Sequence, residues 1–453
     1  MGAVSGKITG RLVGAAGVRP GGRRAYDVYD LYATNGFNLP IVADSGTKWV
    51  EDYDGTLVQS PANTPAMPGL RLDGGVWKTT DTDGTPLFTV DNTIRTPQGS
   101  VDQYDVTYPG VLVEPAATNK VTCRKVNPVD TSGILIVGSP DAIISIIDDS
   151  AALTAAGLDG ICTSGKVYEL VIPSGYVEFD GACGNMNKHS CSLHIRVTSG
   201  GPVEVGLGTS IRPVVNSAAY VKVEQENETP ASVVKKVLVY NSSGAPATVR
   251  CIMPELVESP FLTSPIMPKP GEDDLTTVTR PADNVTFATP SWLLAHPNDF
   301  AVIQTVIPGA EGQTCAYLSS AVDNVNRVSV SCSAEEFYFI KIIGGVNNTL
   351  PRLLYTHSSG TLFQYIIYQS SIVGMGISFR SFDGSDGSSW SAWRVKTDAG
   401  GMANAALAST FNVGSRLSLL YSYATFPMTR ILRIPTNLSA AGLQAWLIAK
   451  AGA

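Results

Sequence analysis

Hydrophobic residues alternate with polar ones in several short stretches of the chain. The clearest stretch runs from residue 191 to 197 and places four apolar side chains on one face of an extended strand: Cys191, Leu193, Ile195 and Val197. The polar side chains between them then point to the other face. Similar stretches lie at 233–240 and 247–253, and turn-forming residues separate them. Short strands at such spacing predict an antiparallel β-sandwich over residues 118–265.

The C-terminal part of the chain shows the same pattern and ends in an amphipathic segment. Further strands are predicted at 300–306, 328–333, 337–343, 362–368, 377–382 and 429–434. After Ser439, three apolar residues recur at the spacing of one helical face, and they predict a final helix packed against a second sandwich: Leu443, Trp446 and Leu447. One other helix is expected between Ser150, as its N-cap, and Gly157, as its stop.

The segments outside these strands carry fewer large apolar side chains. Residues 1–26 hold no acidic residue and five basic ones: Lys7, Arg11, Arg19, Arg23 and Arg24. We expect this segment to be an extended arm that becomes ordered on a partner and anchors the chain. Residues 27–117 predict a small, irregular β region for attachment. The proline-rich stretch 254–270 is interpreted as a strap, with the second sandwich over 266–453. The predicted fold is therefore all-β, with tandem antiparallel β-sandwiches and an extended N-terminal arm.

The composition favours a protein that is part of an assembly. Charged residues make up 16% of the 453 residues, against about 25% in an average soluble domain, so little charge is available to cover a large free surface. The net charge is −7 and no block of Lys and Arg occurs, so we expect no nucleic-acid partner. No apolar stretch of about 18 residues is present, and the start lacks the features of a secretory signal. We therefore expect no membrane partner and folding in a cytosol.

Seven cysteines are scattered along the chain: Cys123, Cys162, Cys183, Cys191, Cys251, Cys315 and Cys332. An odd number at irregular spacing argues against a disulfide framework in a reducing compartment. A free cysteine behaves as a small hydrophobic residue, so we expect buried, reduced thiols.

No motif for catalysis or metal binding stands out. The best metal candidates lack the paired, close spacing of a structural zinc site: Cys183, His189, Cys191 and His194. Asp383 and Asp386 alone would give a calcium ion too few of its six to eight oxygen ligands. Glu335 and Glu336 are adjacent, so a strand would place them on opposite faces, and no histidine lies in a nucleophile motif. We expect no cofactor, no metal, no catalytic residue and no enzyme activity.

Three segments resemble tail-associated proteins of tailed bacteriophages. The first, from Trp49 to Pro65, is similar to an Asp-Gly-x-hydrophobic stretch that ends in Ala-Asn-x-Pro. The second is Gly110-Val-Leu-Val-Glu-Pro-Ala-Ala-Thr-Asn119, in which Ala117 stands where the family usually has arginine. The third combines Pro254–Pro265 with Thr279–Asp283 and resembles the exit strand and linker of a jelly roll of the carbohydrate-binding-module type.

The C-terminal part resembles a concanavalin A-like sandwich in its last strand and helix, and residues 381–394 are similar to a segment of phage tail fibres. The resemblance implies a jelly roll over 118–265 and a concanavalin A-like domain over 266–453. It also implies a virion component, often trimeric, and no single chemistry.

These observations together lead us to expect a structural component of a tailed-phage virion, in the tail, a fibre or the baseplate. It would assemble in the bacterial cytoplasm with other virion proteins, as a homo-oligomer and most simply a trimer. Adhesion to host-surface glycans is a further expectation, because flat aromatic rings bury the apolar C–H faces of sugars. The candidate contacts are Tyr365, Tyr368, Trp390 and Trp393.

Alternatives remain open at this point. The four aromatic residues could be ordinary core residues. The protein could be a capsid or collar decoration protein without glycan binding, or a free protein that binds or cleaves carbohydrate.

Overall fold

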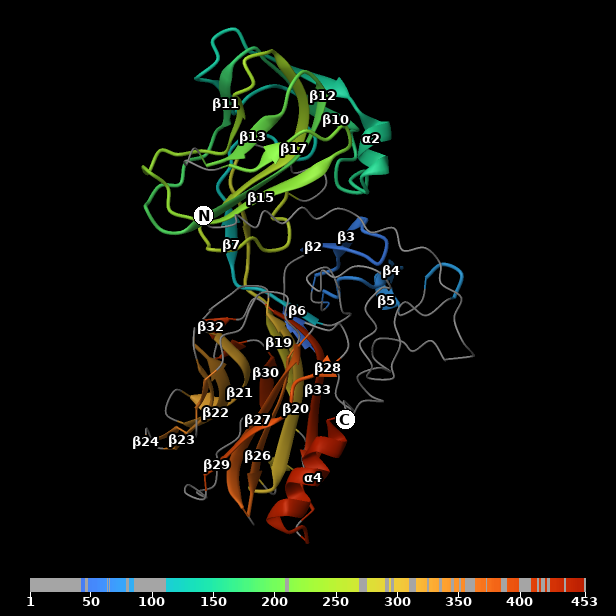
Figure 1. Cartoon of the computed structure of the whole chain (residues 1–453). Coiled ribbons are helices and arrows are strands. Elements are labelled where there is room, and N and C mark those ends of the chain that lie inside the picture. The colour runs from blue at the N-terminus through green and yellow to red at the C-terminus, as the bar shows by residue number, and fades with distance from the viewer. Residues whose placement is uncertain are drawn as a thin grey trace. The chain divides into compact units, whose positions relative to one another are not determined.

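The described chain is folded almost entirely into antiparallel β-sheets, as Figure 1 shows for this computed structural model. The structure describes residues 42–44, 48–78 (except 63 and 65), 81–84, 111–268 (except 208–211) and, with several short gaps, 275–451. The predicted all-β fold is confirmed for these residues. The predicted basic arm lies outside them, and so do all its basic residues: Lys7, Arg11, Arg19, Arg23 and Arg24.

The described residues group into two compact units, and each unit combines segments that are distant in the sequence. Unit 1 contains the described residues of Thr47–Gln59 and Ala116–Pro281. Unit 2 contains those of Gly14–Gly46, Ser60–Pro115 and Ala282–Ala453. The boundaries expected after residues 26, 117 and 265 assume contiguous domains, and they stay a prediction.

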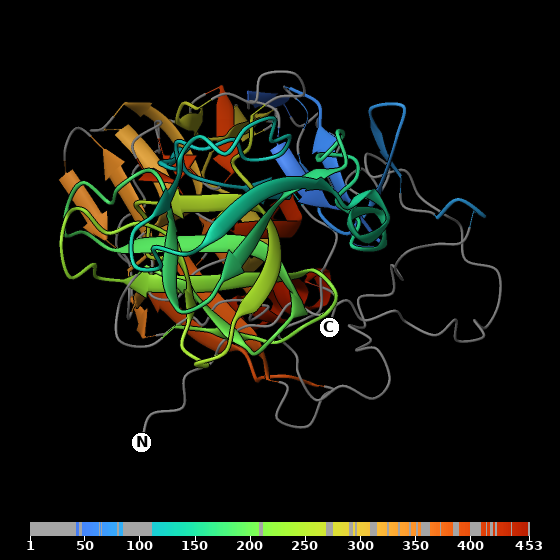
Figure 2. The ribbon, with the colours of Figure 1, turned by 90° about the horizontal axis from the view of Figure 1, so that it is seen from above.

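Unit 1 is a sandwich of two five-stranded antiparallel sheets, seen from above in Figure 2. Sheet 1 has the order β15-β12-β17-β10-β9, with bounds Val221–Glu228, His189–Ser199, Ala247–Val257, Lys166–Ile172 and Ile143–Asp148. Sheet 2 has the order β14-β13-β16-β11-β8, with bounds Val214–Val215, Val203–Gly206, Leu238–Asn241, Gly175–Phe179 and Ile134–Ile136.

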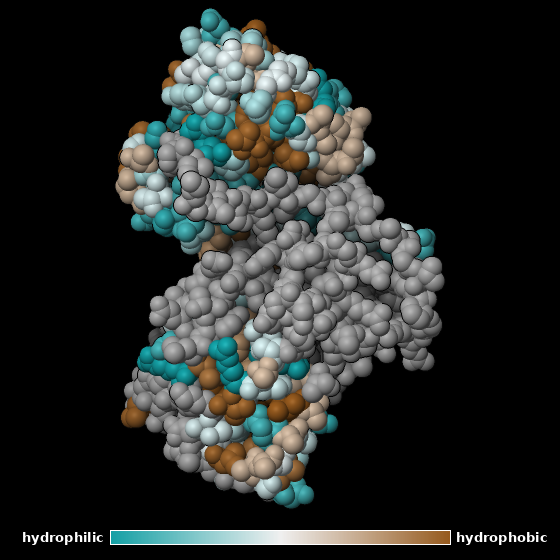
Figure 3. Space-filling view, viewed as in Figure 1, coloured by the Kyte–Doolittle hydropathy of each residue, from teal (hydrophilic) through white to brown (hydrophobic). Residues whose placement is uncertain are grey.

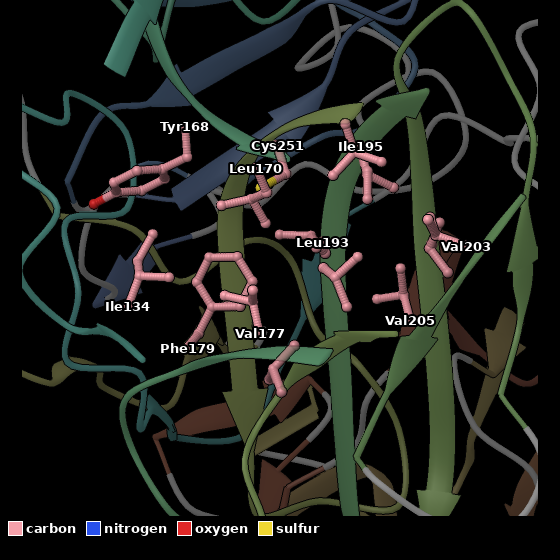
Figure 4. Close-up of a cluster of buried hydrophobic side chains, with 14 of the residues drawn as sticks. Ile134, Tyr168, Leu170, Val177, Phe179, Leu193, Ile195, Val203, Val205 and Cys251 are labelled. Atoms are coloured by element: carbon pink, nitrogen blue, oxygen red, sulfur yellow. The ribbon is translucent and has the colours of Figure 1, made fainter. Parts of the chain in front are cut away.

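The core of unit 1 lies between its two sheets, and Figure 4 shows its central side chains. Leu193 and Ile195 of β12 point into it with Cys191, as the alternation in the sequence predicts. Val177 and Phe179 reach the same core from β11 in sheet 2. Burying a large apolar side chain contributes about 1.5–3 kcal/mol to the free energy of folding. The facing rows of apolar side chains from the two sheets therefore hold the sheets together.

The outer face of sheet 1 is also covered, which the alternating pattern alone does not predict. A second apolar cluster forms there from Trp49 and Leu57, Leu153 of helix α2 (Ser150–Ala155), and Ile252 and Met253 of β17. Trp49 and Leu57 belong to a hairpin of two short strands, β2 (Lys48–Glu51) and β3 (Leu57–Ser60). The segment Thr47–Gln59 thus packs on a sandwich that begins more than fifty residues later in the chain.

Helix α2 ends at Ala155, and Gly157 follows its C-cap in a positive-φ conformation that favours glycine, so it stops the helix as predicted. Its N-cap, however, is Asp149 and not Ser150, and the Asp149 side chain makes no capping hydrogen bond. The carboxylate is used elsewhere, because it accepts from Arg196 Nε (2.9 Å) and Nη2 (2.6 Å) and from Arg250 Nη1 (2.8 Å). Tyr220 Oη donates to it as well, at 2.9 Å. Asp149 therefore joins three elements on the outer face of sheet 1.

A two-stranded ribbon lies where the chain enters and leaves this sandwich. Strands β7 (Ala117–Asn119) and β18 (Val278–Arg280) pair antiparallel within unit 1. Asn119 is buried, and its Nδ2 donates to the carbonyl oxygens of Pro254 (3.1 Å) and Ile266 (3.2 Å). This asparagine fixes the incoming strand β7 to β17 and to the segment that follows β17.

Unit 2 contains two larger antiparallel sheets. Sheet 3 has the order β1-β19-β30-β21-β22-β23-β24, with β25 also paired to β23; the bounds are Val42–Asp44, Asn284–Ala288, Thr410–Val413, Cys315–Asp323, Asn326–Cys332, Glu336–Ile343, Val346–Thr349 and Leu353–Leu354. Sheet 4 has the order β28-β27-β26-β20-β33-β6, with β29 also paired to β27; the bounds are Ser389–Trp390, Gly374–Asp383, Phe363–Ser370, Phe300–Pro308, Ala424–Arg433, Val111–Val113 and Arg394–Asp398. Two small hairpins complete the described strands of the unit: β4 (Arg71–Asp73) with β5 (Val76–Lys78), and β31 (Ser415–Arg416) with β32 (Leu420–Tyr421).

Aromatic rings from both sheets form the core of unit 2. Tyr317 and Phe337 come from sheet 3, and Phe363, Tyr365 and Phe379 come from sheet 4. The ring centroids of Phe337 and Tyr365 are 4.9 Å apart, and those of Tyr317 and Phe363 are 5.5 Å apart. Aromatic pairs at such distances stabilise a core beyond the area that they bury, so unit 2 is also a sandwich.

Helix α4 (Ala440–Lys450) covers the other face of sheet 4, as the sequence predicts. Ser439 is its N-cap and accepts a hydrogen bond from Gly442 N at 3.1 Å. Leu443 and Leu447 are buried against Ile303 and Ile366 of the sheet. Sheet 4 is therefore packed on both faces.

One general expectation, on the cysteines, can be compared with the described residues. Six of the seven cysteines are buried free thiols, as expected: Cys123, Cys162, Cys183, Cys191, Cys251 and Cys332. Within the same part of the chain, no helix is both long and apolar enough to cross a membrane.

Candidate functional site

The two tyrosines expected to contact glycans, Tyr365 and Tyr368, lie in the interior of unit 2. Tyr365 points toward sheet 3, and its hydroxyl donates to Gln304 Oε1. Tyr368 points to the opposite face and packs under α4, with its ring against the backbone of Gly376. Both rings are buried because sheet 3 covers one face of sheet 4 and α4 covers the other. The structure therefore supports the core alternative for these two residues and presents neither ring to a ligand.

The two tryptophan candidates lie near the same sheet. Trp393 is partly buried, and the guanidinium of Arg380 lies 4.6 Å from the centroid of its ring. Arg380 is itself buried and donates twice to Gln364 Oε1, at 2.9 and 2.6 Å. Trp390 ends β28, and its side chain lies outside the described residues. Glycan contact by either tryptophan stays a prediction.

The four metal candidates do not converge on one point. Cys183 and Cys191 lie in the core of unit 1, whereas His194 points to the outer face of sheet 1. His189 is fixed by backbone oxygens, with Nδ1 2.8 Å from Asn187 O and Nε2 3.1 Å from Cys183 O. In the part of the chain that the structure describes, no three potential metal ligands form a group.

The outer face of sheet 2 carries a row of polar and aromatic side chains that the sequence analysis did not single out. Tyr176 of β11 is the cross-strand neighbour of Tyr240 of β16, and Tyr240 is the neighbour of Glu204 of β13. Because the residues beside them point into the core, these three side chains point outward. Each is only partly buried. Val214 of β14 continues the row as the neighbour of Glu204 and is 66% exposed.

Arg212 completes this row. Its guanidinium lies 4.7 Å from the centroid of the Tyr240 ring. Nε donates to Glu204 Oε2 at 3.1 Å, and Nη2 lies 2.9 Å from the same oxygen. The other carboxylate oxygen of Glu204 accepts from Ser242 Oγ at 2.9 Å. The arginine is thus held in one orientation by an aromatic face and a carboxylate. We call the set Tyr176, Glu204, Arg212, Tyr240 and Ser242 the sheet-2 platform.

Two glycines make room for the platform. A Cβ at Gly138 would lie 2.2 Å from Cε1 of Tyr176, so only glycine allows the Tyr176 ring to lie against this edge of the sheet. A Cβ at Gly206 would lie 3.0 Å from Cγ of Arg212 and 2.3 Å from Oε1 of Gln225. Larger residues at either position would displace a platform side chain.

The charges on this face are nearly balanced. Lys236 Nζ lies 2.6 Å from Asp180 Oδ1, and this hydrogen bond lowers the pKa of Asp180. Arg212 and Glu204 compensate each other in the same way, and Glu178 of β11 adds one further outward-facing carboxylate. Figure 3 shows one view of the described surface of unit 1, where hydrophilic and hydrophobic residues lie side by side.

Sequence reasoning missed the platform for a physical reason. A tyrosine between core-facing residues, as in Gly175–Phe179, is ordinary in a strand and carries no signal of function. Only the order of the strands brings Tyr176 next to Tyr240. The alternation of Val203, Glu204 and Val205 is a sequence signal that would indicate an outward-facing acid, but it does not indicate its partner.

Comparison with known proteins finds only distant similarities, and these are to solved structures. No protein-family model and no curated protein matches the sequence. Among solved structures, a carbohydrate-binding module, CBM66 from Bacillus subtilis, is 11% identical with a TM-score of 0.21, over 33% of this chain and 81% of that chain. A GH43 protein from Bacillus licheniformis, BlXynB, is 11% identical with a TM-score of 0.21, over 59% of this chain and 63% of that chain. The tail fibre protein gp63.1 of an E. coli phage is 10% identical with a TM-score of 0.20, over 70% of this chain and 42% of that chain. The last two are thus covered over less than two thirds of their length, and similarity at this level does not bear on function.

Proposed function

We propose that the protein is a structural component of a tailed-phage virion that binds a saccharide of the host surface through the sheet-2 platform. The observation that carries the binding role is the partly exposed row of Tyr176, Tyr240 and Glu204, with Arg212 fixed beside it. Aromatic rings bury the C–H faces of sugars, and a carboxylate, a guanidinium and a hydroxyl bond to sugar hydroxyls.

The placement on a virion rests on other observations. The segments 49–65, 110–119 and 254–265 with 279–283 resemble tail-associated phage proteins, and the charged fraction of 16% suits a chain that buries much of its surface in an assembly. The partners in this proposal are other virion proteins and further copies of this chain, most simply a trimer. The role is binding and display without catalysis.

A glycan array tests the binding role with the full chain. We expect the wild-type protein to retain a subset of saccharides and the variants Tyr176→Ala and Tyr240→Ala to lose them. Tyr53→Ala is the matched control, since Tyr53 is also partly buried but lies in the β2–β3 hairpin, which packs on the other sheet. Absence of any retained saccharide, or equal retention by both platform variants, would overturn the proposal.

Mass spectrometry of purified virions tests the location directly. We expect the chain to co-purify with particles. Deleting residues 1–26 should leave the melting temperature nearly unchanged and sharply reduce incorporation, because a basic segment poor in apolar residues gains order only against a partner. Incorporation of the truncated chain at the normal level would show that the anchor lies elsewhere.

The second candidate is a decoration protein without glycan binding. It is favoured by the burial of Tyr365 and Tyr368, which removes two of the four contacts expected in unit 2. If the chain co-purifies with virions but binds no saccharide on the array, the result would support this second candidate.

A further inference from the structure

The charge arrangement of the sheet-2 platform indicates which saccharides it accepts. We infer that its ligand is an uncharged saccharide unit and that the Glu204–Arg212 pair excludes acidic sugars. This inference rests on the proposed glycan-binding role of the platform and specifies its ligand class.

The first step is the state of Arg212. An arginine without a carboxylate partner would attract the carboxylate of an acidic sugar, because its planar donors match that group. Here Glu204 already takes that place, with Arg212 Nε and Nη2 both directed at Oε2. To bond to Arg212, an acidic ligand would therefore have to displace the Glu204 carboxylate, and its own negative charge would then lie close to that of Glu204.

The second step is the field around the pair. Asp180 and Lys236 compensate each other at 2.6 Å, whereas Glu178 has no basic partner among the ion pairs of the described residues and adds one negative charge. A ligand that brings a further negative charge meets a weakly repulsive face. A neutral sugar meets no such cost.

The third step is what the platform offers to a neutral sugar. The rings of Tyr176 and Tyr240 supply apolar area, and Gly138 allows the Tyr176 ring to lie against the sheet edge. At the border of that area, the carboxylate of Glu204 and the hydroxyl oxygen of Ser242, whose proton is donated to Glu204, can accept hydrogen bonds from sugar hydroxyls. Arg212 is held over Tyr240 and bonded to Glu204, so these groups are already ordered and need little rearrangement on binding.

The test uses matched ligands. The full-length protein is titrated with a neutral oligosaccharide of glucose or galactose units and with its counterpart in which hydroxymethyl groups are oxidised to carboxylates. We expect the neutral ligand to bind at least about tenfold more tightly. Its affinity should change little between about 0.05 M and about 0.5 M salt, because screening weakens only charge-dependent binding.

Two variants sharpen the result. Glu204→Gln removes the carboxylate that compensates Arg212, so the preference should shift toward the acidic ligand, with binding that weakens as salt rises. The matched control is Glu169→Gln, which breaks a similar pair on the outer face of sheet 1, where Glu169 Oε2 accepts from Arg250 Nε at 3.0 Å. The control should keep the wild-type preference.

The outcomes separate the two claims. Acidic ligands that bind the wild-type chain as tightly as neutral ones, or a Glu204→Gln variant with unchanged preference, would overturn the inference and leave the proposed function standing. Failure of the wild-type chain to bind any saccharide would overturn both. A neutral preference that Tyr240→Ala abolishes and Glu169→Gln preserves would support both.

Discussion

Individual polar residues are buried in this protein where a simple strand pattern would place them in water. His194 is predicted from the alternation to face outward, and it does leave the core of unit 1, but the outer face of sheet 1 is itself covered and the side chain is only 9% exposed. Its Nδ1 is buried and has no hydrogen-bond partner within the described structure. Burial, and then the charge of Lys222, lowers the pKa of His194 from 6.5 to about 3.

This histidine makes stability depend on pH. Its pKa is lower in the folded than in the unfolded chain, so its contribution to stability is complete above pH 6.5 and is lost as pH falls from 6.5 toward 3. Replacing it with glutamine removes the titration. Between about pH 7.5 and about pH 5, we expect the wild-type chain to lose about 2 kcal/mol more unfolding free energy than His194→Gln. Denaturant unfolding at the two pH values measures this, and equal losses would contradict it.

Asp149 is the second residue whose role depends on its partners. It is largely buried and accepts from Arg196, Arg250 and Tyr220. In Asp149→Asn these donors lose a charged acceptor, so we expect a loss of about 2 kcal/mol in unfolding free energy. This loss is smaller than that for breaking a fully buried ion pair, because both arginines are partly exposed. Asp148→Asn is the control, since Asp148 is exposed and bonds to the neighbouring Ser150. Similar losses for the two variants would argue against the network.

At the scale of elements, the sequence predicts well where strands form, but poorly which faces of the sheets are covered by another layer. The stretches expected near 191–197, 300–306 and 377–382 lie within β12, β20 and β27, because alternating apolar residues select extended structure. The stretch 233–240 is a strand only over Leu238–Asn241. The sequence does not show which layer covers the second face of a sheet, and for that reason it cannot distinguish a surface position from a core position for Tyr365 and Tyr368.

Helix α4 is the element for which the sequence predicts both position and packing. Leu447 is fully buried against sheet 4. We expect Leu447→Ala to lower the unfolding free energy of unit 2 by about 3 kcal/mol, through lost burial and a residual cavity. Ile448→Ala removes the same number of carbon atoms from a less buried position of the same helix and should cost less. Thermal unfolding followed by tryptophan fluorescence compares the two variants, and the reverse order would show that α4 packs with another face.

At the scale of the whole molecule, the two units are not consecutive stretches of the chain. Unit 1 includes the hairpin with Trp49 and Leu57, and unit 2 includes β1 and β6 from the N-terminal quarter of the sequence. Neither assignment can be read from local patterns, because each depends on contacts between segments far apart in the sequence.

A fragment of residues 118–265 should therefore be incomplete. It lacks the hairpin that covers the second apolar cluster on sheet 1, so Met253 and Leu153 would be exposed. We expect this fragment to bind a hydrophobic dye and to unfold at a lower denaturant concentration than unit 1 in the full chain. A fragment that is as stable and as free of dye binding as the full chain would show that the hairpin contributes little.

The ribbon of β7 and β18 has a mechanical consequence. The chain passes from Ser60–Pro115 into Ala116–Pro281 and back into Ala282–Ala453, and the two passages lie next to each other as paired strands. On the unit 2 side, Glu114 N donates to Asp283 Oδ2 at 2.7 Å, and Asp283 N donates to Glu114 O at 3.0 Å. Tension along this ribbon would then be divided between two paired covalent backbones, so each would bear only part of it. We therefore expect the paired ribbon to stretch less under load than a single unpaired strand would.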